Sequence, residues 1–361
     1  MPSSKWDTET RDVSRASDKI AVGDFIVETP LIEVHRAAGA RMAEYDGCVL
    51  PEAFSDLERE YRAAKEHAAI FDTNWQAIVT LAGRDRVKYL HNISSNDIKS
   101  LTEGHGTLAL LLNPQGHILA ELEVYALPEK LLVLSHVSQR ERTVATLKKY
   151  VIGSQVQIED LTDRYGGFAV SGLGSDLAEF SAKETAFDSG PGYVLRRTRI
   201  GSVDTEFIVP RVDLAGLWRK MLTEVRAAGG EPIGMAAFHA LRLEAGVPWF
   251  PADFNDAMIP HEAALETTHI SFTKGCYTGQ EIVERVRSRG HVNRKRVSLR
   301  FATAAPPQAG TKLRANGTEV GFVTSVALSP TAGAVGMGYV RREQFAPGSV
   351  VEFDGGTAEV R

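Results

Sequence analysis

The chain has 361 residues, of which 43% are hydrophobic and 24% are charged, and its formal net charge is −5. This composition predicts a folded globular protein of two or three domains, and no apolar run reaches the roughly 18 residues of a membrane span. The polar N-terminus lacks the apolar core of a secretory signal, and two cysteines are too few for a disulfide framework. We therefore expect a cytoplasmic protein with no membrane attachment and no domain-wide basic surface for genomic DNA.

The N-terminal part of the chain divides into an arm and a first set of elements. Residues 1–50 are polar at first and then carry only short apolar patches, so we expect an arm there. A helical spacing of apolar residues follows within 52–71. The segment WQAIVTLAG (75–83) predicts a strand that ends at a glycine, and RDRVKYLHNI (84–93) predicts a short amphipathic helix.

Two hairpins are predicted further along the chain. LALLL (108–112) and ILAELEVYAL (118–127) are strand patterns, and NPQG (113–116) between them has the residues of a turn. GYVLRRTRI (192–200) and DTEFIVP (204–210) form a second such pair, with a break at a Gly-Ser step.

Toward the C-terminus the predicted elements change from helices to short strands. Helical patterns over 214–230 and 235–246 each end at glycine. From Val297 onward, short strands alternate with turns, which indicates a small barrel or sandwich. The sequence therefore predicts an α+β protein with an all-β domain at its C-terminus.

A basic segment lies between these regions. Residues 274–296 contain seven basic and two acidic side chains, a local charge of +5 in a chain whose other residues carry −10. Such a segment is either a solvated basic surface or a binding site for an anion.

The same segment begins with KGCYTGQE (274–281), which contains one of the two cysteines. Nearby cations and a helix N-terminus both favour the thiolate form of a cysteine, and QEIVERVR (280–287) has helical spacing. Gly275 and Gly279 allow unusual backbone conformations and close approach of another molecule. Cys276 is therefore a candidate reactive thiolate, and the alternative is a small buried hydrophobic residue.

Two other kinds of site are alternatives for this cysteine. Cys276 and Cys48 cannot by themselves hold zinc or an iron–sulfur cluster, because such sites need more ligands and no CxxC or HxxxH spacing exists. Any cluster ligands beyond Cys276 would have to come from a partner or a small thiol. A cysteine nucleophile assisted by His269 or His291 is a further possibility, which sequence proximity does not establish.

The sequence resembles a known family at several points. KGCYTGQE, preceded by LRLEAGVPWFPADF (241–254), resembles the motif of the YgfZ-type folate-binding proteins, which assist iron–sulfur enzymes, including enzymes that modify tRNA. Residues 69–98 resemble the start of the wider superfamily that includes the glycine-cleavage T-protein, an aminomethyltransferase. The resemblance covers roughly residues 55–345 and implies three domains around a central channel for tetrahydrofolate, the last a β-barrel. It divides the chain into a folate-binding module of two interleaved α+β domains at 51–295 and a barrel at 296–361.

The resemblance also implies individual site residues. Asp97 matches the T-protein aspartate at the reacting end of folate, although its residue type and position equally suit a helix N-cap. Asn113 matches a position near the pterin ring, and from its surroundings alone it is a turn residue.

Further residues carry the features specific to the YgfZ-type motif. Lys274 and Cys276 are the residues that distinguish it, so Cys276, Lys274 and Asp97 are the candidate catalytic residues. We expect Arg285 and Arg287 to meet the polyglutamate tail of folate or an acidic surface of a partner.

Two positions depart from the T-protein pattern. Ser202 stands where the T-protein has its pterin-binding glutamate, and Phe238 stands where it has an arginine. These departures favour a tetrahydrofolate-binding accessory protein that supports iron–sulfur cluster assembly or repair, with iron–sulfur proteins or assembly factors as partners. The alternatives are a folate-dependent aminomethyltransferase of glycine cleavage, which would use Asp97, and a cysteine hydrolase or transferase.

Overall fold

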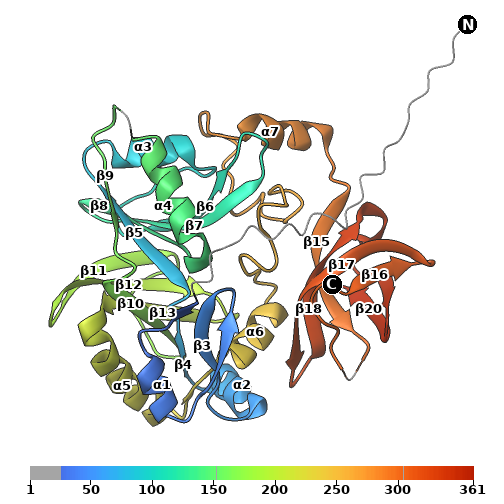
Figure 1. Cartoon of the computed structure of the whole chain (residues 1–361), viewed down its shortest axis with the longest axis horizontal. Helices are drawn as coiled ribbons and strands as arrows, with labels where there is room; N and C mark the ends of the chain where they lie inside the picture. The colour runs from blue at the N-terminus through green and yellow to red at the C-terminus, as the bar shows by residue number, and fades with distance from the viewer. Residues whose placement is uncertain (1–25, 152, 304) are drawn as a thin grey trace, which may run out of the picture.

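The computed structural model describes residues 26–151, 153–303 and 305–361, so half of the expected arm lies outside the described residues. The elements form two α+β domains and a closed barrel (Figure 1). The predicted α+β class with an all-β C-terminal domain is confirmed.

Residues 26–50 join the first domain. They form a short helix and, with the residues just beyond, a small sheet in the order β1-β3-β2. Cys48 and Leu50 are fully buried in the core of the domain. The elements are β1 (Val27–Glu28), α1 (Ile32–Ala37), β2 (Arg41–Tyr45) and β3 (Cys48–Ala53).

A six-stranded sheet forms the centre of the first domain. In sheet order its strands are β11 (Ser181–Phe187), β12 (Gly190–Thr198), β13 (Val203–Pro210), β10 (Tyr165–Ser171), β4 (Ala69–Asp72) and β14 (Glu231–Pro232). The predicted second hairpin is present as the antiparallel pair of β12 and β13. Helix α5 (Arg211–Ala227) covers the sheet, because its buried Leu214 and Trp218 pack against Phe168 of β10.

A five-stranded sheet forms the second domain, and its chain segment is inserted between β4 and β10. In sheet order its strands are β6 (Gly106–Leu112), β7 (Ile118–Ala126), β8 (Lys130–His136), β5 (Gln76–Ala82) and β9 (Gln157–Asp160). Its helices are α3 (Arg86–Ile93), the 3₁₀ turn η2 (Val137–Gln139) and α4 (Arg140–Lys149).

Strand β7 shows how this sheet is oriented. Side chains alternate between the two faces of a strand, and Ala120, Leu122 and Val124 are buried in the core of the second domain. Glu121 and Glu123 therefore project from the opposite face, away from that core.

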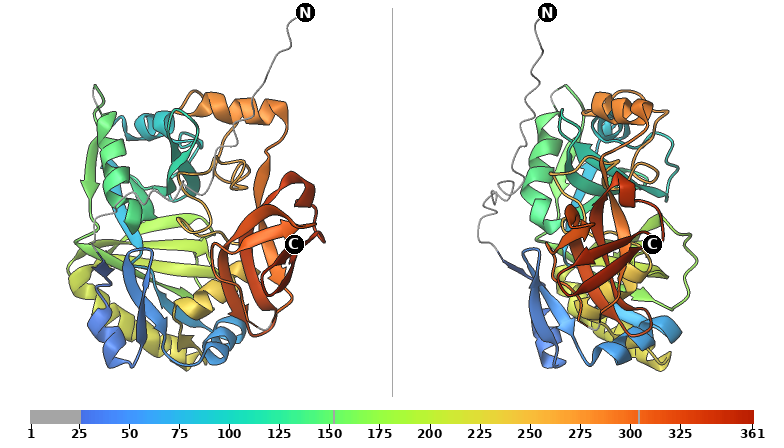
Figure 2. Two further views of the ribbon diagram at one scale, coloured as in Figure 1. Left: turned by 45° about the vertical axis from the view of Figure 1, so that its right-hand side comes forward. Right: turned by 90° about the vertical axis from the view of Figure 1, so that its right-hand side faces the viewer.

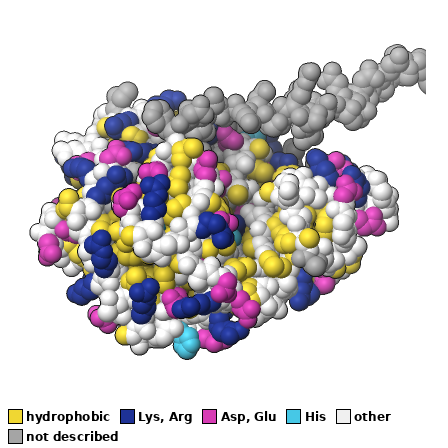
Figure 3. All heavy atoms as spheres, turned by 60° about the horizontal axis from the view of Figure 1, so that its bottom comes forward, with side chains coloured by type: hydrophobic (Ala, Val, Ile, Leu, Met, Phe, Trp, Pro, Cys, Tyr) yellow, Lys and Arg dark blue, Asp and Glu magenta, His cyan; other side chains and the backbone are white. Residues whose placement is uncertain are grey.

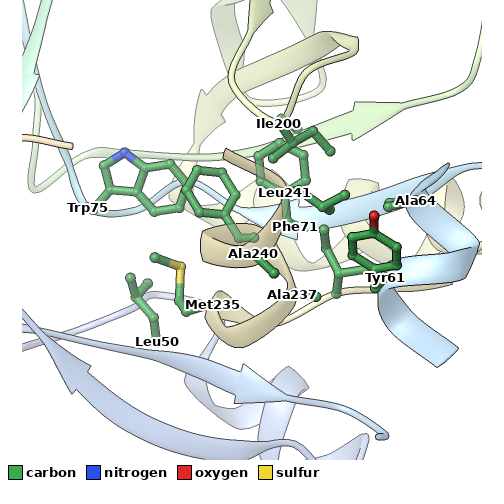
Figure 4. Close-up of a cluster of buried hydrophobic side chains, with 14 of the residues drawn as sticks. Leu50, Tyr61, Ala64, Phe71, Trp75, Ile200, Met235, Ala237, Ala240 and Leu241 are labelled. Carbon is green, nitrogen blue, oxygen red and sulfur yellow. The ribbon is translucent and has the colours of Figure 1, made fainter. Parts of the chain in front are cut away.

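Helix α6 (Met235–Glu244) joins the first domain to the rest of the molecule. Seven of its ten residues are buried, because it packs against α2 (Leu57–Glu66), β3 and the barrel strand β17 (Thr318–Ser329). Figure 4 shows Ala237, Ala240 and Leu241 of α6 within a hydrophobic cluster. Other elements contribute Leu50, Tyr61, Phe71 and Trp75 to the same cluster.

The C-terminal domain is a closed six-stranded barrel. In order around the barrel its strands are β15 (Arg294–Phe301), β18 (Gly333–Arg341), β17, β16 (Lys312–Ala315), β19 (Val350–Phe353) and β20 (Gly356–Val360), with the 3₁₀ turn η3 (Arg342–Gln344) after β18. Before it, α7 (Gln280–Arg289) crosses from the second domain to β15 at the top of the molecule (Figure 2).

The surface of the molecule carries charges of both signs. Basic and acidic side chains are interspersed over the face that Figure 3 displays. Among the described residues, no helix has the length and apolar character needed to cross a membrane.

Candidate functional site

A cavity of about 620 Å³ lies where the two α+β domains, α6 and the barrel meet. Ligand cavities in proteins are typically about 300–1,000 Å³ in volume, so this one can hold a cofactor-sized molecule. Its walls come from β6, β7 and β8 of the second domain, from the end of β12, from α6, from loops at 246–250 and 264–269, and from Arg296 of β15.

One wall of the cavity is aromatic. The rings of Trp75, Phe238 and Trp249 contact one another with centroids 4.9–5.5 Å apart. His136 lies beside Trp249, and burial lowers its pKa to about 3, so its imidazole is neutral at physiological pH. This wall suits a flat ring.

A second wall carries a buried cluster of charges. Glu123 of β7 lies 2.9 Å from Arg197 and 3.6 Å from Arg199. Arg199 in turn contacts Asp204 at 2.7 Å and Glu206 at 2.6 Å. Two guanidinium groups thus face three carboxylates, which leaves one negative charge in excess.

Burial and the neighbouring charges together shift the pKa values of the carboxyl groups in this cluster. Burial raises the pKa of Glu206 to about 7, although Arg199 acts in the opposite direction. Burial also acts to raise the pKa of Glu123, but Arg197 and Arg199 outweigh it and leave that pKa below its ordinary value. We therefore place the extra proton on Glu206 and a negative charge on Glu123, which lines the cavity.

A third wall holds a histidine–carboxylate pair. His269 Nε2 lies 2.9 Å from Oε1 of Glu121, and His269 Nδ1 lies 2.7 Å from the hydroxyl of Thr268. All three side chains belong to residues that line the cavity. The histidine ring is buried, whereas the Glu121 side chain is 28% exposed, so its carboxylate is accessible from the cavity. This arrangement can accept and donate protons.

The floor of the cavity joins α6 to the barrel. Arg242 lines the cavity and donates to Asp253 at 2.8 Å and to Ser325 of β17 at 3.0 Å. Thr324 donates to the other oxygen of Asp253 at 2.6 Å. This buried network fixes the barrel relative to the first domain.

None of the six residues that the sequence proposed as catalytic or folate-binding lines this cavity: Asp97, Asn113, Lys274, Cys276, Arg285 and Arg287. Of the two histidines named as possible partners of Cys276, His269 lines the cavity and His291 does not. Of the two positions that depart from the T-protein pattern, Phe238 lines it and Ser202 does not. The cavity instead presents Glu121, Glu123 and Arg197.

The KGCYTGQE segment contacts the end of α3 and the β6–β7 turn, and its last two residues begin α7. Cys276 is exposed to solvent, whereas Tyr277 is buried. Gly279 precedes α7 with φ +83°, and a Cβ there would lie 2.6 Å from the carbonyl oxygen of Asn113. Only glycine fits such a position, so the predicted role of Gly279 has a physical basis. The side chain of Asn113 accepts from the backbone N–H of His117 at 2.9 Å and so closes the β6–β7 turn.

Lys274 caps a helix end rather than facing solvent. Its ammonium donates to the backbone carbonyls of His91, Ser94 and Asn96, the last at 3.1 Å. His91 lies in the last turn of α3 and Ser94 is its C-cap, where a cation is favourable. Burial lowers the pKa of Lys274 to about 8.

Asp97 lies beside this lysine network. It is partly exposed, 3.2 Å from His91, and it accepts from the backbone N–H groups of Lys99 and Ser100 at 3.0 and 3.3 Å. Burial acts to raise the pKa of Asp97, but the bonds to Ser100 and Lys99 outweigh it and lower that pKa.

The two arginines lie on different sides of α7, because residues two apart on a helix do not share a face. Arg285 pairs with Glu281 at 2.6 Å, and Arg287 pairs with Glu284 at 3.5 Å and lies over the ring of Phe272. Both side chains are about half exposed, so these pairs leave them accessible.

The carboxylates and arginines of the cavity were missed in the sequence, although a signal was present. Glu121 and Glu123 are two residues apart in an otherwise apolar strand, and Arg197 and Arg199 are two residues apart at the end of β12 and just beyond it. Residues two apart share one face of a strand. Paired charges on one face of a buried strand indicate a polar cavity or a buried ion-pair network.

The fold and the cavity define a protein of the glycine-cleavage T-protein class. Residues 31–274 match the model of the GCVT N-terminal domain, and residues 294–360 match that of the glycine cleavage T-protein C-terminal barrel domain. The chain belongs to this family, whose aminomethyltransferases use tetrahydrofolate.

Several aminomethyltransferases are similar to this chain along most of their length. The chain is 27% identical to an aminomethyltransferase of Rubrobacter xylanophilus, over 87% of each chain. It is also 27% identical to an aminomethyltransferase of Bacillus subtilis, over 90% of this chain and 94% of that one. The crystal structure of glycine cleavage system aminomethyltransferase T from Bartonella henselae superposes with a TM-score of 0.86 at 25% identity, covering 93% of this chain and 97% of that chain.

Proposed function

We propose that this chain binds tetrahydrofolate in the cavity between its domains and transfers a one-carbon unit to it. The observation that carries the proposal is the cavity itself, which combines an aromatic wall with buried carboxylates in a chain of the T-protein family. The flat ring system of folate suits the aromatic wall around Trp75 and Trp249. Its N–H and amino groups are donors for which the carboxylate of Glu123 is an acceptor.

Binding is tested by titrating tetrahydrofolate and following tryptophan fluorescence. Trp75 and Trp249 both line the cavity, so a bound pterin quenches their emission. We expect Glu123→Gln to weaken binding about tenfold, because the loss of one charge-assisted hydrogen bond corresponds to about 1.4 kcal/mol. Glu281→Gln is the matched control, since that glutamate lies on α7 and does not line the cavity. Quenching that does not saturate would exclude the proposal.

The names of the relatives favour aminomethyl transfer as the reaction. In that reaction an amine leaves as ammonia, so a group that handles protons near the transferred carbon is needed. The pair of Glu121 and His269 supplies one, because Glu121 faces the cavity and His269 fixes one of its oxygens.

Reconstitution with an aminomethyl-loaded lipoyl carrier protein tests this reaction. We expect ammonia release that depends on tetrahydrofolate and that falls about 100-fold in Glu121→Gln. Asp97→Asn is measured beside it, because the sequence resemblance assigns the chemistry to Asp97 whereas that residue does not line the cavity. Wild-type protein that binds folate but releases no ammonia would exclude aminomethyl transfer.

A second candidate function is support of iron–sulfur cluster assembly or repair, and through it of tRNA-modifying enzymes. The observation that favours it is the exposed thiol of Cys276 within KGCYTGQE, the segment that resembles YgfZ-type proteins. An exposed thiolate can engage a cluster, a persulfide or a mixed disulfide on a partner, which would be an iron–sulfur protein or assembly factor.

Complementation of a deletion strain separates the two candidates. We expect wild type and the neighbouring exposed control Thr273→Ala to restore iron–sulfur enzyme activity, and Cys276→Ala to fail. Full restoration by Cys276→Ala would remove the role of the cysteine. Glycine-cleavage activity in the same strains reports on aminomethyl transfer independently.

A further inference from the structure

A second pocket of about 410 Å³ lies between α7, the start of β15 and η3. No residue of this pocket lines the central cavity. The segment around 261–269 and strand β15 separate this pocket from the central cavity. Lys295 of β15 lines the pocket and its neighbour Arg296 lines the cavity, because successive side chains of a strand point to opposite faces.

The pocket is basic and partly aromatic. Arg287, Lys295 and Arg342 line it, with Glu266 as the only carboxylate among its described lining residues. The Glu266 carboxylate pairs with Lys295 at 3.0 Å. Arg287 has a longer pair with Glu284 at 3.5 Å that leaves its side chain about half exposed, so the guanidinium groups of Arg287 and Arg342 can interact with an anion. Phe272 and Phe345 form apolar parts of the wall, and other lining residues are His261, Val286, Gly290, His291 and Val292.

Flat surfaces in the pocket are already arranged for stacking. The guanidinium of Arg287 lies 4.3 Å from the centroid of the Phe272 ring, and the His261 ring lies 6.2 Å from the same centroid. A planar guanidinium held against an aromatic face presents a flat cationic surface, on which aromatic rings bind by cation–π and stacking contacts.

Two buried polar atoms of the pocket have no hydrogen-bond partner among the described residues: Nδ1 of His261 and Oε2 of Glu266. Buried polar atoms are nearly always hydrogen-bonded in folded proteins, so each unpaired one needs an explanation. Burial lowers the pKa of His261, which keeps its ring neutral near pH 7 and lets Nδ1 accept or donate. The carboxylate oxygen of Glu266 can only accept, so its missing partner is an N–H or O–H donor.

We propose that this pocket binds a phosphorylated heterocycle of the nucleoside monophosphate kind. Arg287 and Arg342 hold the phosphate, because guanidinium groups bind phosphate through paired charge-assisted hydrogen bonds. The ring lies among Phe272, Phe345 and the guanidinium of Arg287. An amino group on the ring donates to Oε2 of Glu266, which gives that atom its missing partner.

Calorimetric titration of the whole chain with AMP, adenosine and inorganic phosphate tests each part of this proposal. We expect AMP to bind at least tenfold more tightly than either adenosine or phosphate, since only AMP has both the ring and the anion. We expect Arg287→Ala to weaken AMP binding about tenfold, the effect of losing one charge-assisted contact.

Arg285→Ala is the matched control for this experiment. Arg285 lies on the same helix with a similar ion pair and exposure, but it does not line the pocket. Glu266→Gln keeps the size of the side chain, and we expect it to weaken AMP binding while leaving phosphate binding unchanged. Equal losses in Arg285→Ala and Arg287→Ala, or phosphate binding as tight as AMP binding, would overturn the proposal. Tetrahydrofolate titration of the same variants shows that the central cavity is intact.

Discussion

Replacing Lys274 by methionine tests whether this lysine holds the KGCYTGQE segment in place or acts on Cys276. The ammonium of Lys274 is buried and bonded to the backbone carbonyls of His91, Ser94 and Asn96. Methionine keeps the length of the side chain and removes all three bonds. The end of α3 then loses its capping cation, and the three carbonyls lose a partner.

The size of the effect follows from two opposing contributions. Hydrogen bonds to a charged group stabilise by about 1.5–3 kcal/mol each, so the three together contribute about 5–9 kcal/mol. Burial lowers the pKa of Lys274 from 10.5 to about 8, which corresponds to a penalty of about 3 kcal/mol that methionine does not carry. The difference leaves a net destabilisation of about 2–6 kcal/mol.

Thermal unfolding of Lys274→Met and of the control Lys99→Met measures this effect. Lys99 is exposed on the neighbouring segment, and its replacement removes the same charge, so we expect a change within about 0.5 kcal/mol. We expect Lys274→Met to melt at least about 4 °C lower than wild type. The alkylation rate of Cys276 in the folded protein is the second measurement, and we expect it not to fall in Lys274→Met. A variant as stable as wild type, or one whose Cys276 reacts several-fold more slowly, would refute this reasoning and support a catalytic role for the lysine.

Three further predictions concern other parts of the molecule. Native protein should show one thiol that reacts at once with a disulfide reagent, Cys276, and a second only after unfolding, because Cys48 is fully buried and burial raises its pKa. Glu206 has a pKa raised from 4.5 to about 7, so the folded protein keeps a proton that the unfolded chain has released, and stability falls by up to about 3 kcal/mol as the pH rises between those values. Urea titrations of Glu206→Gln at several pH values should lack this decrease, and an equal decrease in the variant would contradict the assignment. Arg242→Met leaves Asp253 buried without its partner, so we expect a loss of about 3–5 kcal/mol in calorimetry, and a loss below 1 kcal/mol would be evidence against the buried pair as the link to the barrel.

Much of the fold was predictable because it depends on local spacing. Strand alternation gave the two hairpins of 108–127 and 192–210, and glycine-terminated apolar spacing gave α6. The strand-rich C-terminal region became a barrel. The exception is residues 26–50, which were expected to belong to an arm but form short strands. These strands are stabilised by pairing and by burial of Cys48 rather than by any strong sequence pattern of their own.

The sequence by itself determined which residues share a face and which positions require glycine. It placed Glu121 and Glu123 on one face of a strand, and it marked Gly279 as a position with an unusual backbone conformation. These properties follow from the period of a strand and from the missing Cβ of glycine, and both act within a few residues.

Only the tertiary structure decided which groups meet. Glu123 faces Arg197 and Arg199, more than 70 positions later, and Lys274 meets carbonyls near residue 91 rather than facing Cys276 beside it. The physical reason is that buried charges must find partners, and the packing of three domains determines which partners are within reach. For that reason the cavity carries its charges on residues other than those that the motif singled out.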